Sequence, residues 1–538
     1  MFRPSRPTVI AATLATTAAL TLPLATTASA DPTDRSENLQ ERVTLDGVLD
    51  HLEAFQDIAD ENGGNRAAGL PGYAASADYV AQQMRSAGYK VRQQKFEFDF
   101  FQELSTPQFE QTAPDATTYA EGDDFATMTF SGSTAPESIT GTIEPVDLAL
   151  SAPETSTSGC ETEDFAGFTA GNVALIQRGT CTFAQKAENA QAAGAVGAVI
   201  LNQGNGADRS GVLNGTLGGD VVDIPVLGTS FAIGQDLADP AGTTVRIFTD
   251  TVSEPRITTN VIANSRYGNP NNVVMLGAHL DSVPEGPGYN DNATGSAAIL
   301  EVAQEMADVR PENKMRFAWW GAEELGLVGS TDYVESLPPG QLRRIALYLN
   351  FDMVGSPNFI RGVYDGDGSD FGLTGPPGSD AIEAMFNEHF ASESLPFQAT
   401  EFSGRSDYQA FINNGIPSGG LFTGADGVKT EAEEEMYGGV AGSIYDPCYH
   451  EACDSSTPVA DGADADVYAE LIAENDLVGN VAPEALDTNA DAIAHAAITY
   501  AFDTSTVNGV GPKPGQSTSA AGHAGPHAGP HLHGAVKR

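Results

Sequence analysis

The chain has 538 residues, 41% of them hydrophobic, and its 73 acidic residues against 26 lysines and arginines give a formal charge of −47. At roughly 150 residues per domain, this length predicts two or three domains of ordinary globular composition. Nucleic acids and anionic membranes bind basic surfaces, so the charge argues against both as partners. An acidic surface suits a salty exterior, but it does not identify a substrate.

Residues 1–30 predict a secretory signal peptide. Arg3 and Arg6 precede an uncharged, apolar and threonine-rich stretch at 9–25, and the small residues Ala28-Ser29-Ala30 form a cleavage site. A retained N-terminal anchor is the alternative. Because no other stretch reaches the ~18 consecutive apolar residues of a membrane helix, we expect a secreted, extracellular protein.

Residues 31–105 and 255–503 predict one α/β domain that an insert divides. Leu49, Leu52 and Ile58 give the first helical segment an apolar face. After Thr258 strands and helices alternate: "NVVMLGAH", a helix at 293–309, "KMRFAWW", a helix after 326, and "IALYLNFDMVG". This alternation predicts a mixed, largely parallel sheet flanked by helices.

Two segments differ from this pattern in composition. Residues 106–254 are rich in Thr, Ser, Gly and Pro between short apolar strands, which predicts a separate, mostly β insert. Residues 504–538 are rich in Gly, Pro, Ala and His and have almost no large apolar side chains, which predicts a disordered tail.

Four cysteines in an exported chain indicate two disulfides. Their spacing favours a pairing of Cys160 with Cys181 and of Cys448 with Cys453. Four cysteines allow three pairings, so the others remain open. A four-thiolate zinc site is a further alternative, but the paired C-x-x-C spacing of such sites is missing.

Acids and imidazoles recur where three predicted strands end. His279 ends "NVVMLGAH", Glu323 and Glu324 follow "RFAWW", and Asp352 ends "LYLNFD". Asp291 stands before a helix, where a helix cap is the alternative to a ligand. Because the carboxyl ends of parallel strands open onto one crevice, we expect these groups to meet there.

This set of groups suits a pair of zinc ions. His450, in the loop "DPCYHEACD", supplies a second imidazole. Two histidines, two aspartates and a glutamate are N and O donors that zinc accepts, and Asp291 is the candidate to bridge ions ~3.5–4 Å apart. Asp281, two residues after His279, is placed to fix the imidazole tautomer.

The motifs resemble a known enzyme family. "GAHLDSV…GYNDNATGSAA", "FAWWGAEELGLVGS", "YLNFDMVGSP", "GRSDY" and "CYHEACD" resemble the secreted bacterial leucyl aminopeptidases of the co-catalytic di-zinc family. The resemblance covers residues 45–100 and 255–503 and implies the zinc exopeptidase fold. In the insert, "GNVALIQRGTCTFAQKAENAQAAGAVGAVILNQ" resembles the protease-associated (PA) domain that several members carry there.

The resemblance also implies the role of each site residue. The implied zinc ligands are His279 and Asp352 on one ion, Glu324 and His450 on the other, and Asp291 across both. Glu323 matches the general base, and Tyr449 a tyrosine whose hydroxyl stabilises the tetrahedral intermediate. Arg405, in "GRSD", matches a residue near the substrate, with a structural ion pair as its alternative.

Some members of the family also bind calcium near the C-terminus. Asp487 and Asp491 preserve the two acids. The N-terminal counterpart falls near Glu41-Arg42, where a cation disfavours the ion. Capping or solvated roles for the two aspartates are therefore the favoured alternative.

The residues fit a metallo-exopeptidase, and two other classes are the alternatives: a relative on the same fold with different chemistry, and a non-catalytic binding protein whose β insert binds the partner. A single-zinc glutaminyl cyclase need not keep all five ligands, a carboxypeptidase should offer cations to the substrate carboxylate, and a non-catalytic binding protein should lack a ligand or the base. None of these describes the chain, which also has no G-x-S-x-G or H-E-x-x-H motif. We expect a monomeric aminopeptidase with two zinc ions that acts on peptides and proteins and, by resemblance, prefers large apolar N-terminal residues such as leucine.

Overall fold

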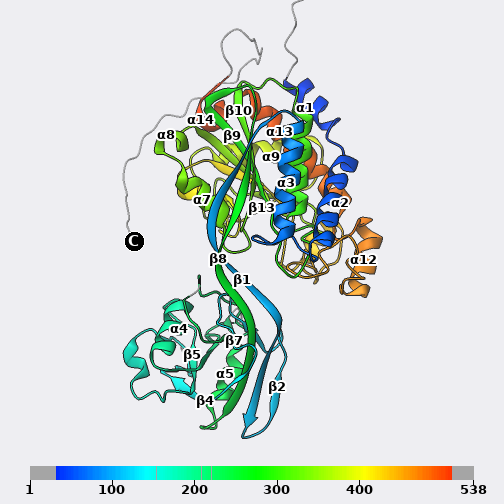
Figure 1. Cartoon of the computed structure of the whole chain (residues 1–538). Helices are drawn as coiled ribbons and strands as arrows, with labels where there is room; N and C mark the ends of the chain where they lie inside the picture. The colour runs from blue at the N-terminus through cyan, green and yellow to red at the C-terminus, as the bar shows by residue number, and fades with distance from the viewer. Residues whose placement is uncertain (1–31, 153, 207–208, 220, 512–538) are drawn as a thin grey trace, which may run out of the picture.

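The computed structural model describes residues 32–152, 154–206, 209–219 and 221–511. The predicted signal peptide, and the predicted tail from 512 onward, lie outside the described residues. Figure 1 shows a main domain and an insert joined by two long strands, β1 (Lys90–Ala113) and β8 (Thr244–Asn264). Within the described residues, no helix is both long and apolar enough to cross a membrane.

A mixed sheet forms the centre of the main domain. Its strands lie in the order β13-β12-β14-β11-β9-β10-β8, and β1 pairs with β8. β9 runs parallel to β10 and β11, and β11 runs parallel to β14, while β8 and β12 run antiparallel to their neighbours β10 and β14. The bounds are β9 (Asn269–His279), β10 (Asn313–Trp320), β11 (Ile345–Phe351), β12 (Gly362–Tyr364), β13 (Gln398–Thr400) and β14 (Ser418–Phe422). The predicted largely parallel sheet is confirmed.

Helices cover both faces of this sheet. The larger core lies under α1 (Pro32–Gln40), α2 (Leu45–Glu61), α3 (Pro71–Ser86), α6 (Ala293–Glu305), α9 (Ser379–Ser392) and α13 (Pro483–Phe502). The smaller core lies under α7 (Val328–Ser336) and α10 (Tyr408–Asn413). Trp319 packs in the first and Trp320 in the second, because successive side chains of a strand point to opposite faces. Burial on both faces explains why the second half of β10, Phe317–Trp320, is continuously apolar.

Four short helices complete the main domain. They are α8 (Pro339–Leu342), α11 (Glu431–Tyr437), α12 (Ala465–Asn475) and α14 (Ser505–Asn508). The last of them corrects the predicted start of the tail at 504. Thr504 and Val507 are buried, so the packed chain continues past the predicted boundary at 503.

The strands of the insert continue the sheet from β8 in the order β4-β5-β6-β7-β3, and the insert has two cores of its own. Its elements are β2 (Thr117–Tyr119), β3 (Phe125–Thr127), β4 (Ile139–Val146), a 3₁₀ turn (Thr162–Phe165), β5 (Val173–Gln177), α4 (Phe183–Ala192), β6 (Gly197–Leu201), β7 (Val226–Thr229) and α5 (Phe231–Ala238). β1 and β8 are antiparallel partners over their whole length, from Lys90 opposite Asn264 to Ala113 opposite Thr244, with irregularities in the register between Glu103 and Ala113. The predicted limits 106 and 254 therefore fall inside two strands that both domains share.

Candidate metal centre

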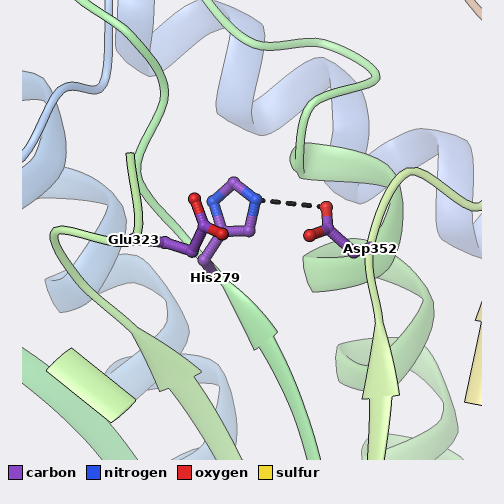
Figure 2. A group of neighbouring side chains, drawn as sticks. All are labelled: His279, Glu323 and Asp352. Carbon is purple, nitrogen blue, oxygen red and sulfur yellow. Dashed lines mark hydrogen bonds and ion pairs between the residues drawn. The ribbon is translucent and has the colours of Figure 1, made fainter. Parts of the chain in front are cut away.

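Three neighbouring strands deliver the first group of side chains. His279 ends β9, Asp352 follows β11, and Glu323 lies three residues beyond β10. Figure 2 shows the three side chains converging, with His279 Nε2 3.1 Å from Asp352 Oδ1. All three are buried, and one ligand atom of each lies within 4.8 Å of the others. β9 lies between β10 and β11, so the register of a parallel sheet sets this spacing.

Asp291 connects this group to a second one. Its Oδ1 lies 3.2 Å from His279 Nε2, and its Oδ2 lies 3.4 Å from His450 Nε2. His450 Nε2 is also 3.0 Å from Glu324 Oε2. The helix-cap alternative for Asp291 is wrong, because the N-cap of α6 is Asn292, whose side chain accepts from the Gly295 amide. Both carboxylate oxygens of Asp291 thus face imidazoles.

The donor set fits a pair of divalent cations. Two groups of described residues could each hold an ion: His279, Glu323 and Asp352, and His279, Asp291 and Glu324. Glu324 Oε1 is buried and accepts no hydrogen bond from any described residue. A buried carboxylate oxygen without a donor is costly unless a cation satisfies it. Two imidazoles among carboxylates favour zinc over calcium or magnesium, which take oxygen ligands.

The carboxylates and imidazoles of this centre strongly influence one another's pKa values. Burial and the charges of neighbouring carboxylates raise the pKa of Glu323 well above its usual range, and the same causes, opposed by His450, raise the pKa of Glu324 to about 7. Burial opposes the charging of His450, yet Glu324 and Asp291 raise its pKa to about 11. Burial also opposes the ionisation of Asp291, but hydrogen bonds from both imidazoles lower its pKa overall. The two imidazoles thus favour the ionised form of Asp291, while Asp291 and Glu324 favour the charged form of His450.

Asp281 makes different contacts from those predicted. His279 Nδ1 lies 3.0 Å from the main-chain oxygen of Asp281, whereas the carboxylate is 3.7 Å away. A carbonyl oxygen can only accept, so Nδ1 carries the proton and Nε2 is free to bind a metal. The Asp281 carboxylate instead accepts the backbone amides of Glu323 and Glu324, both at 3.3 Å. It therefore fixes the turn that carries both glutamates.

The structure adds two supporting residues that the sequence did not reveal. Ser406 donates to Asp352 Oδ2 at 2.5 Å and accepts from Asn350 Nδ2 at 2.8 Å, which orients that carboxylate. Arg66 is fully buried and donates to the carbonyls of Leu280, Pro287 and Gly288, between His279 and Asp291. Both lie in loops, where periodicity gives no signal.

The loop that carries His450 is held from two sides. Cys448 and Cys453 form a disulfide around Tyr449 and His450. Asp454 accepts the backbone amide of Asn290 at 2.7 Å and that of Asp291 at 2.9 Å. The disulfide loop is therefore tied directly to the turn that presents Asp291.

Arg405 and Tyr449 lie at the mouth of the site. Arg405 Nη1 pairs with Asp426 Oδ1 at 2.9 Å, and Nη2 donates to the Tyr449 hydroxyl at 3.1 Å. Arg405 therefore forms the ion pair that was its structural alternative and also contacts Tyr449 of the candidate site. Both side chains line a cavity of about 500 Å³ that reaches His279 and Glu323 and has apolar walls.

The chain is similar in sequence to proteins of known families. Residues 260–474 match the model of peptidase family M28, and residues 144–237 match that of the PA domain. An aminopeptidase of Pseudomonas aeruginosa strain UCBPP-PA14 is 48% identical over 462 residues, covering 86% of this chain and 82% of its own. The chain belongs to peptidase family M28.

Two further proteins similar to this M28 peptidase are also aminopeptidases by name. Leucine aminopeptidase 2 of Trichophyton tonsurans is 39% identical over 437 residues, covering 80% of this chain and 83% of its own. The solved aminopeptidase of Aneurinibacillus sp. strain AM-1 has a TM-score of 0.62 at 25% identity, covering 86% of this chain and 95% of its own. The predicted family, its fold and the PA insert are confirmed, and the chain is a peptidase of the aminopeptidase type.

The M28 peptidase contains both predicted disulfides, Cys160–Cys181 and Cys448–Cys453. Replacement of both Cys448 and Cys453 by serine should lower the free energy of unfolding by only roughly 2 kcal/mol, because the loop that the disulfide closes is short. We expect kcat/KM to fall roughly 10²-fold, since a 1 Å misplacement near the reacting atoms can cost that much. Thermal melts and peptide hydrolysis measure the two effects, and the matched replacement of Cys160 and Cys181 is the control. Equal activity of both variants would refute the positional role.

Calcium binding remains an untested prediction. Asp487 and Asp491 lie on α13, where burial and then the charges of Asp487 and Glu393 raise the pKa of Asp491 to about 7. Among the described residues, neither aspartate belongs to a three-ligand group that could hold an ion. Such a group does form at Asp365, Asp367 and Glu383, but both Asp365 oxygens accept backbone amides of their own loop.

Proposed function

We propose that this M28 peptidase is a secreted aminopeptidase that uses two zinc ions to hydrolyse the N-terminal peptide bond of peptides and proteins. The observation that carries the proposal is Asp291, whose two oxygens face His279 on one side and His450 on the other. That arrangement suits one carboxylate shared between two ions. His279 and Asp352 would hold the first ion, and Glu324 and His450 the second.

The chain's own residues supply the remaining chemistry. When bound, zinc polarises the scissile carbonyl and lowers the pKa of an attacking water. Glu323 is the general base: its carboxylate takes a proton from that water and hands it to the leaving amine. Tyr449 donates a hydrogen bond from its hydroxyl to the developing oxyanion, and Arg405 holds that hydroxyl from the other side.

The large cavity supports the proposed preference for apolar N-terminal residues such as leucine. Its walls include Met353, Ile360, Tyr364 and Phe422, and it begins at the candidate base, Glu323. Burying an aliphatic side chain against such walls contributes roughly 1.5–3 kcal/mol. The Trichophyton relative is named a leucine aminopeptidase, which favours the same preference.

Secretion is proposed from the predicted signal peptide at 1–30 together with the disulfides. Two disulfides, with no free cysteine among the described residues, are typical of proteins that fold in an oxidising compartment. Detection of the chain in culture medium with its N-terminus near residue 31 tests this point. Intact, cell-retained protein would contradict it.

We expect the purified protein to contain two zinc ions per chain and to lose peptidase activity on chelation. Elemental analysis and hydrolysis of 4-nitroanilides with different N-terminal residues measure both. Leucine should rank among the best residues, and blocking its amino group should abolish cleavage. Full activity with one ion would refute the two-zinc proposal, and cleavage of the blocked substrate would refute aminopeptidase action.

A further inference from the structure

The insert reaches the metal centre through β1. Phe96, Phe98 and Phe100 alternate along this strand and pack in one apolar cluster with Ala322, while Leu325 packs against the cluster. These last two residues flank the pair Glu323-Glu324. The cluster therefore fixes the position of β1 relative to the catalytic turn, even though β1 continues into the PA domain (Figure 1).

A second cavity lies where the two domains meet. It has a volume of about 280 Å³ and is lined on one side by Phe101, Glu103 and Thr127 of the shared strand and the insert. On the other side it is lined by Glu324 and His450 of the metal centre. The larger cavity also reaches Glu324, so the two cavities approach the same carboxylate from different directions.

An aminopeptidase needs space on both sides of the scissile bond. One residue precedes the bond, and an uninterrupted chain follows it. The larger cavity contains the base Glu323 and apolar walls, which suit the single N-terminal residue. The second cavity is then the available route for the residues that follow the bond.

Acidic side chains dominate the second cavity. Glu103 and Glu285 line it, and no Lys or Arg is present among its described lining residues. Among the described residues, the Glu103 carboxylate accepts a hydrogen bond only from the Thr127 hydroxyl, a long contact of 3.4 Å. Burial, followed by the charges of Glu121, Glu285 and Asp250, raises the pKa of Glu103 to about 7. A cation at this position would stabilise the carboxylate that its surroundings now disfavour.

We propose that the cavity between the PA domain and the metal centre binds the residues after the scissile bond, and that Glu103 selects peptides with Lys or Arg there. This inference rests on the proposed aminopeptidase function. It gives the PA domain a direct part in substrate choice through a carboxylate on the strand it shares with the main domain. Glu103 is a specificity residue that does not touch the reacting atoms.

Three peptide amides test the proposal: Leu-Lys-Gly-Gly, Leu-Gly-Lys-Gly and Leu-Gly-Gly-Gly. We expect the unaltered enzyme to prefer the better lysine peptide over the neutral one by roughly fivefold in kcat/KM, the scale of one partly exposed ion pair. Glu103→Gln should remove this preference. Leu-4-nitroanilide, which ends directly after the bond, should be hydrolysed at rates within about twofold of the unaltered enzyme, since no contact is lost.

Glu97→Gln is the matched control, because Glu97 is an exposed acid on the same strand outside the cavity lining. Glu103→Lys is the second variant, and it should reverse the preference toward Leu-Gly-Asp-Gly amide. Equal loss on all substrates, an unchanged lysine preference in both Glu103 variants, or an equal effect of Glu97→Gln would overturn the proposal. Failure of the proposed function is distinguishable, because the unaltered enzyme would then not cleave Leu-4-nitroanilide.

Discussion

Glu323→Gln is expected to keep the fold and both zinc ions while kcat falls by roughly 10²–10⁴-fold, the usual contribution of a general base. The amide has the size of the carboxyl group but cannot take a proton from water. Glu323 is buried beside His279 and Asp352, and its backbone amide is held by Asp281, so the replacement should not move the turn. The loss should therefore be chemical rather than structural.

Hydrolysis of saturating Leu-4-nitroanilide, zinc content and a thermal melt measure the three quantities on one preparation. Glu323→Asp is a useful companion, because it keeps the base but withdraws it by one methylene and should recover part of the rate. An active Glu323→Gln enzyme, or one that has shed its metal, would show that Glu323 is not the base.

The sequence pattern predicted the site residues that lie at the ends of regular strands. His279, Glu323 and Asp352 follow strands of one parallel sheet, and the rule that such strands share a carboxyl edge brought them together correctly. His450 lies in a loop, and the resemblance to a family, more than any periodicity, assigned it to the same centre. Asp291 was ambiguous because its neighbour Asn292 takes the helix cap that either residue could have formed.

Other features depend on tertiary contacts that the chain pattern does not encode. Arg66, Ser406 and Asp454 lie in loops, and each has a hydrogen-bond partner more than fifty residues away in the sequence. The sequence around each of them therefore looks like that of an ordinary loop. The predicted limits of the insert were wrong for a related reason. Composition changes near 106 and 254, but the pairing of β1 with β8 includes Glu254 and resumes beyond the irregularity that follows Ser105, so neither position ends a strand.

Glu324→Gln should behave in the opposite way to the neighbouring variant, although the chemical change is the same. Glu324 Oε2 lies 3.0 Å from His450 Nε2, and Oε1 is buried without a donor among the described residues. A neutral amide offers a cation one weaker oxygen and removes a full negative charge. We expect affinity for the second zinc to fall by at least roughly 100-fold, because changes to groups that only support a ligand already cost 10–100-fold.

Competition with a chelator measures that affinity, and a zinc titration of activity separates the two glutamates. Added zinc should restore much of the Glu324→Gln activity, since its base is intact, whereas it should not restore Glu323→Gln. Both side chains lie in groups of ligand atoms that share His279, so a general loss of negative charge would affect the two variants alike. Unchanged zinc affinity in Glu324→Gln, or rescue of Glu323→Gln by zinc, would mean that the roles of the two adjacent carboxylates are assigned wrongly.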